Sequence, residues 1–250
     1  MIRLIRAEFL KLRTTQVWFW LLLGAVAVTV LLIVAQLASS DGVKTYPDAV
    51  NALTASGSAY VVVFVLGVLG VTTEFRYQTI TQTVLTTPSR WSLITAKLIT
   101  YGLVGAIYAL ICVAVEMAVA LPWLSSKNID ISLTSEHVPR ALLGVFATVA
   151  LFGIVGLGVG ALIRNQIVAV TVGVIFLLVI NNVLLAIPGV RHVFPYTPAG
   201  AADALFTVTG SRDANGVTLL TGGGGVVVLL LWAFIPALLG AGITMNRDIT

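Results

Sequence analysis

The sequence predicts an all-α integral membrane protein in which six helices cross the bilayer. Of its 250 residues, 58% are hydrophobic and only 10% are charged. An ordinary soluble domain has about 25% charged residues, so this composition does not suit a protein whose whole surface faces water. The apolar residues form continuous runs and do not alternate with polar ones, which indicates helices and excludes a transmembrane barrel.

Six apolar runs approach the length that a spanning helix needs, which is roughly 20 residues for about 30 Å of hydrocarbon. The second run is the shortest and contains Gly67 and Gly70, which weaken it as a helix. We expect residues 1–250 to form a single transmembrane domain. The predicted spans are 17–37, 55–71, 98–121, 141–163, 167–187 and 226–243.

Lysine and arginine residues are unevenly divided between the two sides of this predicted bundle. The side that holds both termini carries nine of them, and the opposite side carries five. Cytoplasmic connections of membrane proteins carry the excess of basic residues. The sequence therefore predicts that the N- and C-termini are both cytoplasmic.

Residues 1–14 are predicted to form an amphipathic helix ahead of the first span. Their apolar positions recur at helical spacing, and a second face is mostly basic. Such a helix lies at the membrane interface with its cations near anionic headgroups; the alternative is a helical basic flank of the first span. The apolar face comprises Ile2, Ile5, Phe9 and Leu12, and the basic residues are Arg3, Arg6, Lys11 and Arg13.

The connection between the second and third predicted spans, residues 74–90, combines charged, aromatic and threonine residues. Tyr77, Ile80 and Val84 have helical spacing, although the threonines make the segment a weak helix. Pro88 disfavours helix at the residue before it, so a new helix starts after this point. These features predict a short polar helix exposed to the cytosol, and an ordinary loop is the alternative.

Three polar residues fall inside the predicted spans, namely Glu116, Asn181 and Asn182. A charged side chain at the bilayer centre costs on the order of a few kcal/mol, so intramembrane carboxylates are candidate functional groups. Glu116 either serves substrate or proton binding, or reaches the outer interface about one and a half turns away, or bonds to a neighbouring helix. For the two asparagines we favour hydrogen bonds between helices.

The longest outer connection, residues 188–225, contains a moderately apolar stretch at 196–209. This stretch is too short to span the bilayer. It forms either a re-entrant or interfacial helix on the rim of the bundle, or an ordered surface loop.

The sequence lacks the motifs of several catalytic classes. We find no P-loop, no nucleophile elbow and no zinc-binding helix. Cys112 is the single cysteine, so neither an intrachain disulfide nor a cysteine-based metal site is available. We expect no catalytic residues, no bound metal or cofactor and no nucleic-acid partner, and any ATP hydrolysis would take place in another polypeptide.

The whole layout resembles the permease subunit of ABC type-2 transporters. The resemblance rests on the basic start, the six spans, the connection Glu-Phe-Arg-x-x-Thr-Ile…Pro-Ser-Arg and the polar end Asn246-Arg247-Asp248. In that family the connection after the second span forms a coupling helix that docks on the ATPase subunit. Gln78 stands where the family commonly has glycine. The resemblance implies a coupling role for Glu74, Phe75, Arg76, Thr79, Ile80, Pro88 and Arg90.

The resemblance also implies a function and partners. The chain would be the permease of a bacterial plasma-membrane exporter that moves a hydrophobic or amphipathic substrate, such as a drug, a peptide or a lipid. It would work among membrane lipids as a dimer with the same or a related permease, and with ABC ATPase subunits that bind ATP and Mg²⁺. Two other classes fit the same residues: a secondary transporter driven by an ion gradient, and a non-transporting membrane scaffold or assembly protein.

Overall fold

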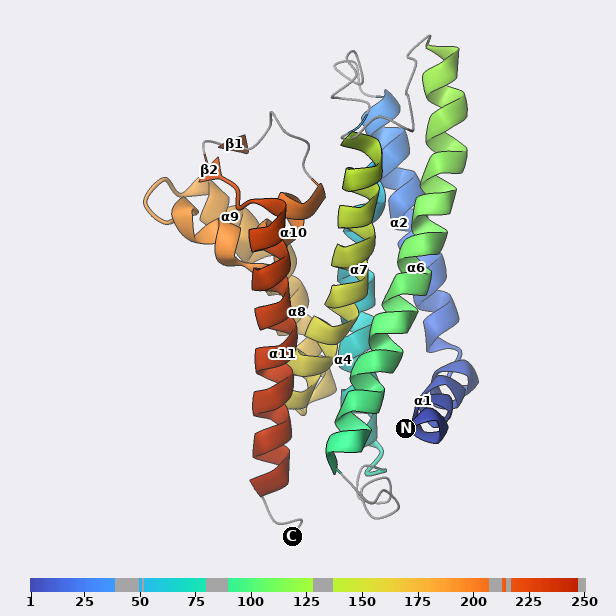
Figure 1. Cartoon of the computed structure of the whole chain (residues 1–250), viewed down its shortest axis with the longest axis vertical. Coiled ribbons are helices and arrows are strands. Elements are labelled where there is room, and N and C mark those ends of the chain that lie inside the picture. Colours follow the sequence, from blue (N-terminus) through green and yellow to red (C-terminus); the bar gives the residue numbers. More distant parts are fainter. Residues whose placement is uncertain are drawn as a thin grey trace.

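Six helices that are long and apolar enough to cross a membrane dominate the computed structural model (Figure 1). The structure describes residues 1–38, 50, 52–79, 90–127, 137–206, 213–214 and 217–246. The chain is therefore an all-α integral membrane protein, as the sequence predicts.

The spanning helices are close to the predicted runs. They are α2 (Val17–Ala38), η1 with α4 (Ala55–Ala59 and Tyr60–Arg76), α6 (Arg90–Ser126), α7 (His137–Leu162), α8 with η2 and α9 (Gln166–Ile175, Phe176–Ile180 and Asn181–Ala186), and α11 (Gly222–Asn246). The other described elements are α1 (Ile2–Thr14), η3 (Arg191–Tyr196), α10 (Pro198–Phe206) and the antiparallel strands β1 (Asp213–Ala214) and β2 (Val217–Thr218).

Two spans extend well beyond their predicted ends. Helix α4 continues to Arg76 and α6 begins at Arg90, although hydropathy places the ends of these spans at residues 71 and 98. Hydropathy marks where side chains prefer lipid, whereas a helix continues wherever its backbone bonds and packing are maintained. Here the added turns carry Glu74 and Lys97, whose charges are paired inside the protein.

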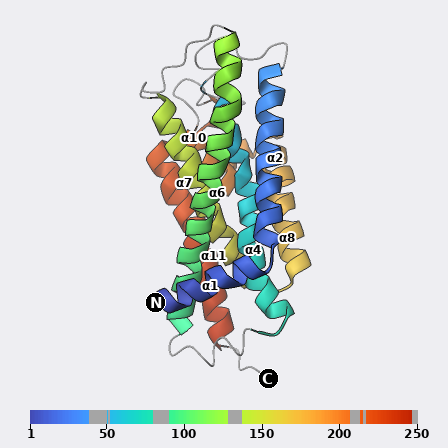
Figure 2. The ribbon, with the colours of Figure 1, turned by 90° about the vertical axis from the view of Figure 1, so that its right-hand side faces the viewer.

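The ends of the bundle differ in architecture. Helix α1 runs crosswise over one end of the long helices, and Figure 2 shows it lying across α4 and α6. The last turn of α11 lies at this same end (Figure 1), as an even number of crossings requires. We call this the α1 end. The opposite end carries α9, α10 and the small β1–β2 pair.

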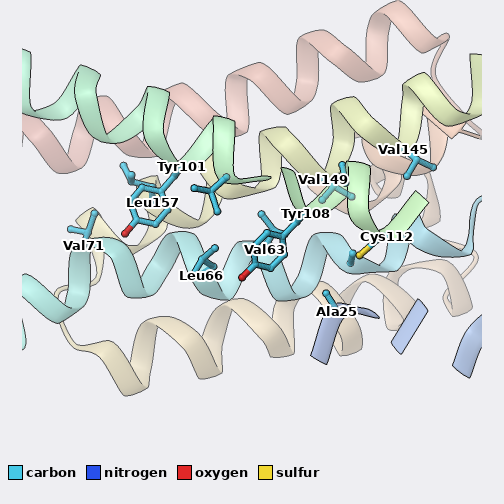
Figure 3. Packing of buried hydrophobic residues seen from close by; sticks show 13 residues of the cluster. Ala25, Val63, Leu66, Val71, Tyr101, Tyr108, Cys112, Val145, Val149 and Leu157 are labelled. Carbon is cyan, nitrogen blue, oxygen red and sulfur yellow. The ribbon is translucent and has the colours of Figure 1, made fainter. Parts of the chain in front are cut away.

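Helix α7 lies at the centre and packs closely against α4, α6 and α11. A cluster of buried side chains runs between α4, α6 and α7, and includes Val63, Leu66, Tyr108 and Val149 (Figure 3). Glycines on α7 let the backbones approach, since a Cβ on Gly156 would lie 2.0 Å from the carbonyl oxygen of Phe64. The Gly156-x-x-x-Gly160 motif thus serves packing within this chain.

Segment 188–225 contains a helix where the sequence left helix and loop open. Helix α10 is buried over most of its length and packs on α7 and α11. The backbones of α10 and α7 also lie close together, because a Cβ on Gly144 of α7 would lie 2.3 Å from the carbonyl oxygen of Leu205. The two short strands, of which β2 packs against η3, were not expected, because two-residue strands leave no readable alternation in a sequence.

Substitution of Gly156 tests this packing. We expect Gly156→Ala to destabilise the protein by about 1–3 kcal/mol or more, because α4 and α7 must move apart to admit the new methyl group. Thermal unfolding in detergent would show this as a lower Tm. Gly24→Ala is the matched control, since a Cβ at Gly24 has no atom within 4 Å, and equal Tm values for the two variants would contradict the prediction.

Candidate functional site

Four charged side chains from three helices meet at the α1 end. Lys97 of α6 donates to Glu8 of α1 and to Glu74 of α4, with Nζ–O distances of 2.7 Å in both cases. Lys11 of α1 lies 2.9 Å from Glu8 and 2.8 Å from Glu74. We call Glu8, Lys11, Glu74 and Lys97 the charge cluster, and it joins α1, α4 and α6 directly.

Most of the charge cluster is shielded from solvent. Glu8, Glu74 and Lys97 are only 3%, 6% and 5% exposed, while the side chain of Lys11 is 45% exposed. Buried charges are tolerated when they are paired and hydrogen-bonded, and two carboxylates here face two ammonium groups. Partial burial by itself lowers the pKa of Lys11, but its bonds to Glu74 and Glu8 outweigh this and raise the pKa above its ordinary value.

The charge cluster corrects the interpretation of three residues. The prediction that Glu74 faces the cytosol is wrong for its side chain, which points into the protein. Lys97 does more than mark topology, and Lys11 binds carboxylates in addition to facing outward. Sequence reasoning did not single out Glu8. The available signal was its position on the face of α1 that also carries Ile5 and Leu12, where an acid needs a buried partner.

Helix α4 ends at Arg76, two residues after Glu74, in a defined cap. The amide of Thr79 donates to the carbonyl of Glu74 at 3.0 Å, and that of Gln78 donates to the carbonyl of Phe75 at 3.3 Å. This is the Schellman arrangement, which requires a left-handed residue at the position of Gln78. Gln78 has φ of 55°, which is the left-handed conformation that glycine adopts at the lowest cost.

Phe75 and Arg76, two of the other predicted coupling residues, make contacts beside this cap. Arg76 is exposed, and its Nη1 lies 3.4 Å from Oε1 of Gln166 at the start of α8. Phe75 is half-buried beneath the guanidinium of Arg164, whose Cζ is 5.4 Å from the ring centre. The end of α4 therefore also contacts the turn between α7 and α8. Thr79 is exposed, Arg90 opens α6, and Ile80 and Pro88 lie outside the described residues.

A cleft of about 650 Å³ opens beside the charge cluster. Its lining includes Glu8, Lys11 and Glu74 from the cluster, together with apolar side chains of α1, α2 and α4. Arg76 and Gln166 also line it. The cleft is therefore amphipathic, because both charged and apolar side chains line it. Within the described part of the chain, no three His, Cys, Asp or Glu residues are grouped so that they could hold a metal ion.

Glu116 lies far from the charge cluster and is fully buried. Its carboxylate accepts hydrogen bonds from the backbone N–H of Ser56 at 3.0 Å and from the Ser56 hydroxyl. These donors belong to the first turn of η1, so an acid from α6 caps the start of the second span. The bond to a neighbouring helix, one of the three alternatives, is present, and a role in substrate or proton binding stays a prediction. Helix α6 also continues to Ser126, farther than the predicted end at residue 121.

Asn181 and Asn182 donate within their own helix, so the prediction of interhelical bonds is wrong for their amide N–H groups. Asn181 Nδ2 lies 2.8 Å from the carbonyl oxygen of Phe176, and Asn182 Nδ2 lies 2.6 Å from that of Leu178. Both acceptors belong to the π-helical turn η2. Such a wide turn displaces backbone carbonyls from their regular partners, and nearby side-chain amides satisfy them.

The basic residues of α1 divide into two groups. Arg3, Arg6 and Arg13 are exposed, as a face that meets headgroups would be, whereas Lys11 also turns toward α4. Phe9 and Leu12 pack against the buried cluster of Figure 3. The apolar face of α1 thus lies on the protein for part of its length.

Removal of Lys97 tests the charge cluster. We expect Lys97→Met to destabilise the protein by about 3–5 kcal/mol, because two buried carboxylates would then share Lys11 alone. The measurement is thermal unfolding in detergent. Lys127→Met is the control, since Lys127 lies at the opposite end of α6 and bonds a carbonyl. Adding Glu74→Gln to Lys97→Met should restore part of the loss, and no restoration would contradict the pairing.

Substitution of Gln78 tests the cap of α4, and here we expect the protein to become more stable. We expect Gln78→Gly to stabilise the protein by about 1 kcal/mol, because glycine adopts the left-handed conformation without the steric cost that other residues bear. Tyr77→Gly should destabilise it, since Tyr77 has φ of −93° and gains nothing from glycine. A lower Tm for Gln78→Gly would show that the cap is not formed.

Comparison with known proteins identifies a family that the sequence matches. The sequence matches the model of a family described as ABC-2 family transporter protein over residues 4–180. The matched region is well over half of the chain and contains the charge cluster, the cap at Gln78 and the cleft. A comparison with curated proteins found no match. The chain belongs to the ABC-2 family of transporter proteins.

Proposed function

We propose that this chain is the permease subunit of an ATP-driven ABC exporter. Membership of the family makes it a membrane component of an ABC transporter, and its six spans make it a multi-pass membrane protein. In this proposal an ATPase subunit supplies the energy and binds ATP and Mg²⁺. A second permease, identical or related, completes the dimer in a bacterial plasma membrane.

The observation that carries the proposal is the anchoring of the end of α4. The charge cluster ties this end to α1 and α6, and Arg76 and Phe75 tie it to the turn between α7 and α8. A force applied to residues 76–79 therefore acts on four other helices at once. Coupling between an ATPase and a transport path requires such a connected set of contacts.

The residues of the coupling segment accordingly have different roles. Glu74 anchors the segment from inside the protein, because its Oε1 accepts from both Lys11 and Lys97. Arg76, Tyr77 and Thr79 are exposed beyond it. These three residues supply the surface on which the ATPase docks.

The substrate in this proposal is a hydrophobic or amphipathic compound that moves outward. An ion-gradient mechanism has less support, because it usually relies on intramembrane carboxylates that gain and lose a partner. Glu116 is already committed to the hydroxyl and the backbone of Ser56. ATP-driven transport needs no such group in the permease.

The experiment is a pull-down of the tagged chain in mild detergent from its native cell, with ATPase activity measured on the eluate. We expect a P-loop protein to co-purify and the activity to be vanadate-sensitive. Arg76→Ala should weaken co-purification about fivefold or more, the effect of an interface residue that contributes more than about 1 kcal/mol. Arg191→Ala, at the opposite end of the bundle, should leave it unchanged.

The contrary outcomes point to different functions. A pure preparation without a nucleotide-binding partner, together with transport that follows an ion gradient, would replace this proposal with a secondary transporter. A partner whose ATPase rate never responds to the chain would identify a scaffold. Equal co-purification of Arg76→Ala and Arg191→Ala would remove the docking role of Arg76 alone.

A further inference from the structure

The cleft beside the charge cluster combines two chemically distinct walls. Leu12, Val17, Leu66 and Leu69 contribute hydrocarbon, while Lys11 and Arg76 place cations beside it. Its volume of about 650 Å³ falls in the usual range for sites that bind small organic molecules. It lies at the α1 end, where α1 runs across the long helices (Figure 2).

The carboxylates in this lining do not oppose an anion as strongly as their number suggests. Both oxygens of Glu8 are bonded to ammonium groups, and Oε1 of Glu74 accepts from two lysines. Glu8 and Glu74 are buried, whereas Lys11 is half-exposed and Arg76 is exposed. The charges that face the open part of the cleft are therefore positive.

The N–H donors of Lys11 and Arg76 that remain unused also favour an anion in the cleft. An ammonium group has three N–H donors, and Glu8 and Glu74 account for two of those of Lys11. The guanidinium of Arg76 makes a long contact of 3.4 Å with Gln166 and retains further N–H donors. Together with Lys97, the three cations exceed the two carboxylates, so the group has a formal charge of +1.

We propose that this cleft binds an anionic membrane lipid from the leaflet at the α1 end. The phosphate accepts hydrogen bonds from Lys11 and Arg76, and the first part of one acyl chain lies along Leu12, Val17 and Leu69. A free phosphate would leave this apolar wall exposed to water, which favours a ligand with a hydrocarbon chain. A zwitterionic lipid would bring an ammonium group to a site that already has surplus positive charge. The proposal does not require an ATPase partner.

The test uses the purified full-length chain in phosphatidylcholine vesicles that contain a trace of photo-crosslinkable phosphatidylglycerol, with the reactive group in the acyl chain. We expect crosslinks on peptides that contain Leu12, Val17 or Leu69. Unlabelled phosphatidylglycerol should compete for them, and unlabelled phosphatidylcholine should not. Equal labelling by a phosphatidylcholine probe, or no label at these positions, would overturn the proposal.

Three variants locate the site. Arg76→Gln should reduce labelling about fivefold, the effect of one cation near an anionic headgroup, while Arg164→Gln should not, because Arg164 lies outside the cleft at the same end. Leu69→Trp should also reduce labelling, because it fills the apolar wall without changing any charge. Equal labelling of all three variants would overturn the proposal, as would full competition by millimolar inorganic phosphate, which would identify a phosphate site.

Discussion

Burial of the Lys97 ammonium is the interaction on which one whole end of this protein depends. A cation in an apolar bundle is stable only when carboxylates surround it, and here they come from two other helices. Helix α1 is consequently held against α4 and α6 by buried ion pairs as well as by Phe9 and Leu12. The position of helix α1 is thus set by charge pairing inside the protein together with this apolar packing.

The cap of α4 places exposed residues close to the buried carboxylate of Glu74. Because Gln78 turns the chain in a left-handed conformation, α4 ends at Arg76, two residues after the buried carboxylate of Glu74, and the exposed residues Tyr77 and Thr79 follow. A partner that moves these residues acts on a helix end that cannot shift without its neighbours. The cleft is formed by the same elements, so a lipid bound there would contact the anchor of the coupling segment and α1 together.

The rest of the bundle is held by a different means. Close backbone contacts at Gly67, Gly153, Gly156 and Gly160 bring α4 and α7 together without any polar group. At the opposite end, Glu116 caps the start of the second span, and α10 packs on α7 and α11. Charge thus fixes the helices at the two ends of the spans, while small residues fix them between. This division follows from the cost of polar groups in hydrocarbon.

The sequence by itself determined the class, the six spans and the family resemblance, because lipid imposes a length and a continuous apolar character on each span. It also indicated that Glu116 and the segment from Glu74 onward are candidate functional residues. Only the tertiary structure decided what these residues do. Whether Glu74 faces solvent or pairs with Lys97 depends on where α1 and α6 lie, and hydropathy carries no information about such partners. Gln78 shows the same limit of sequence reasoning, because its left-handed conformation is a property of the backbone. A glycine at this position would have indicated that conformation, whereas a glutamine does not.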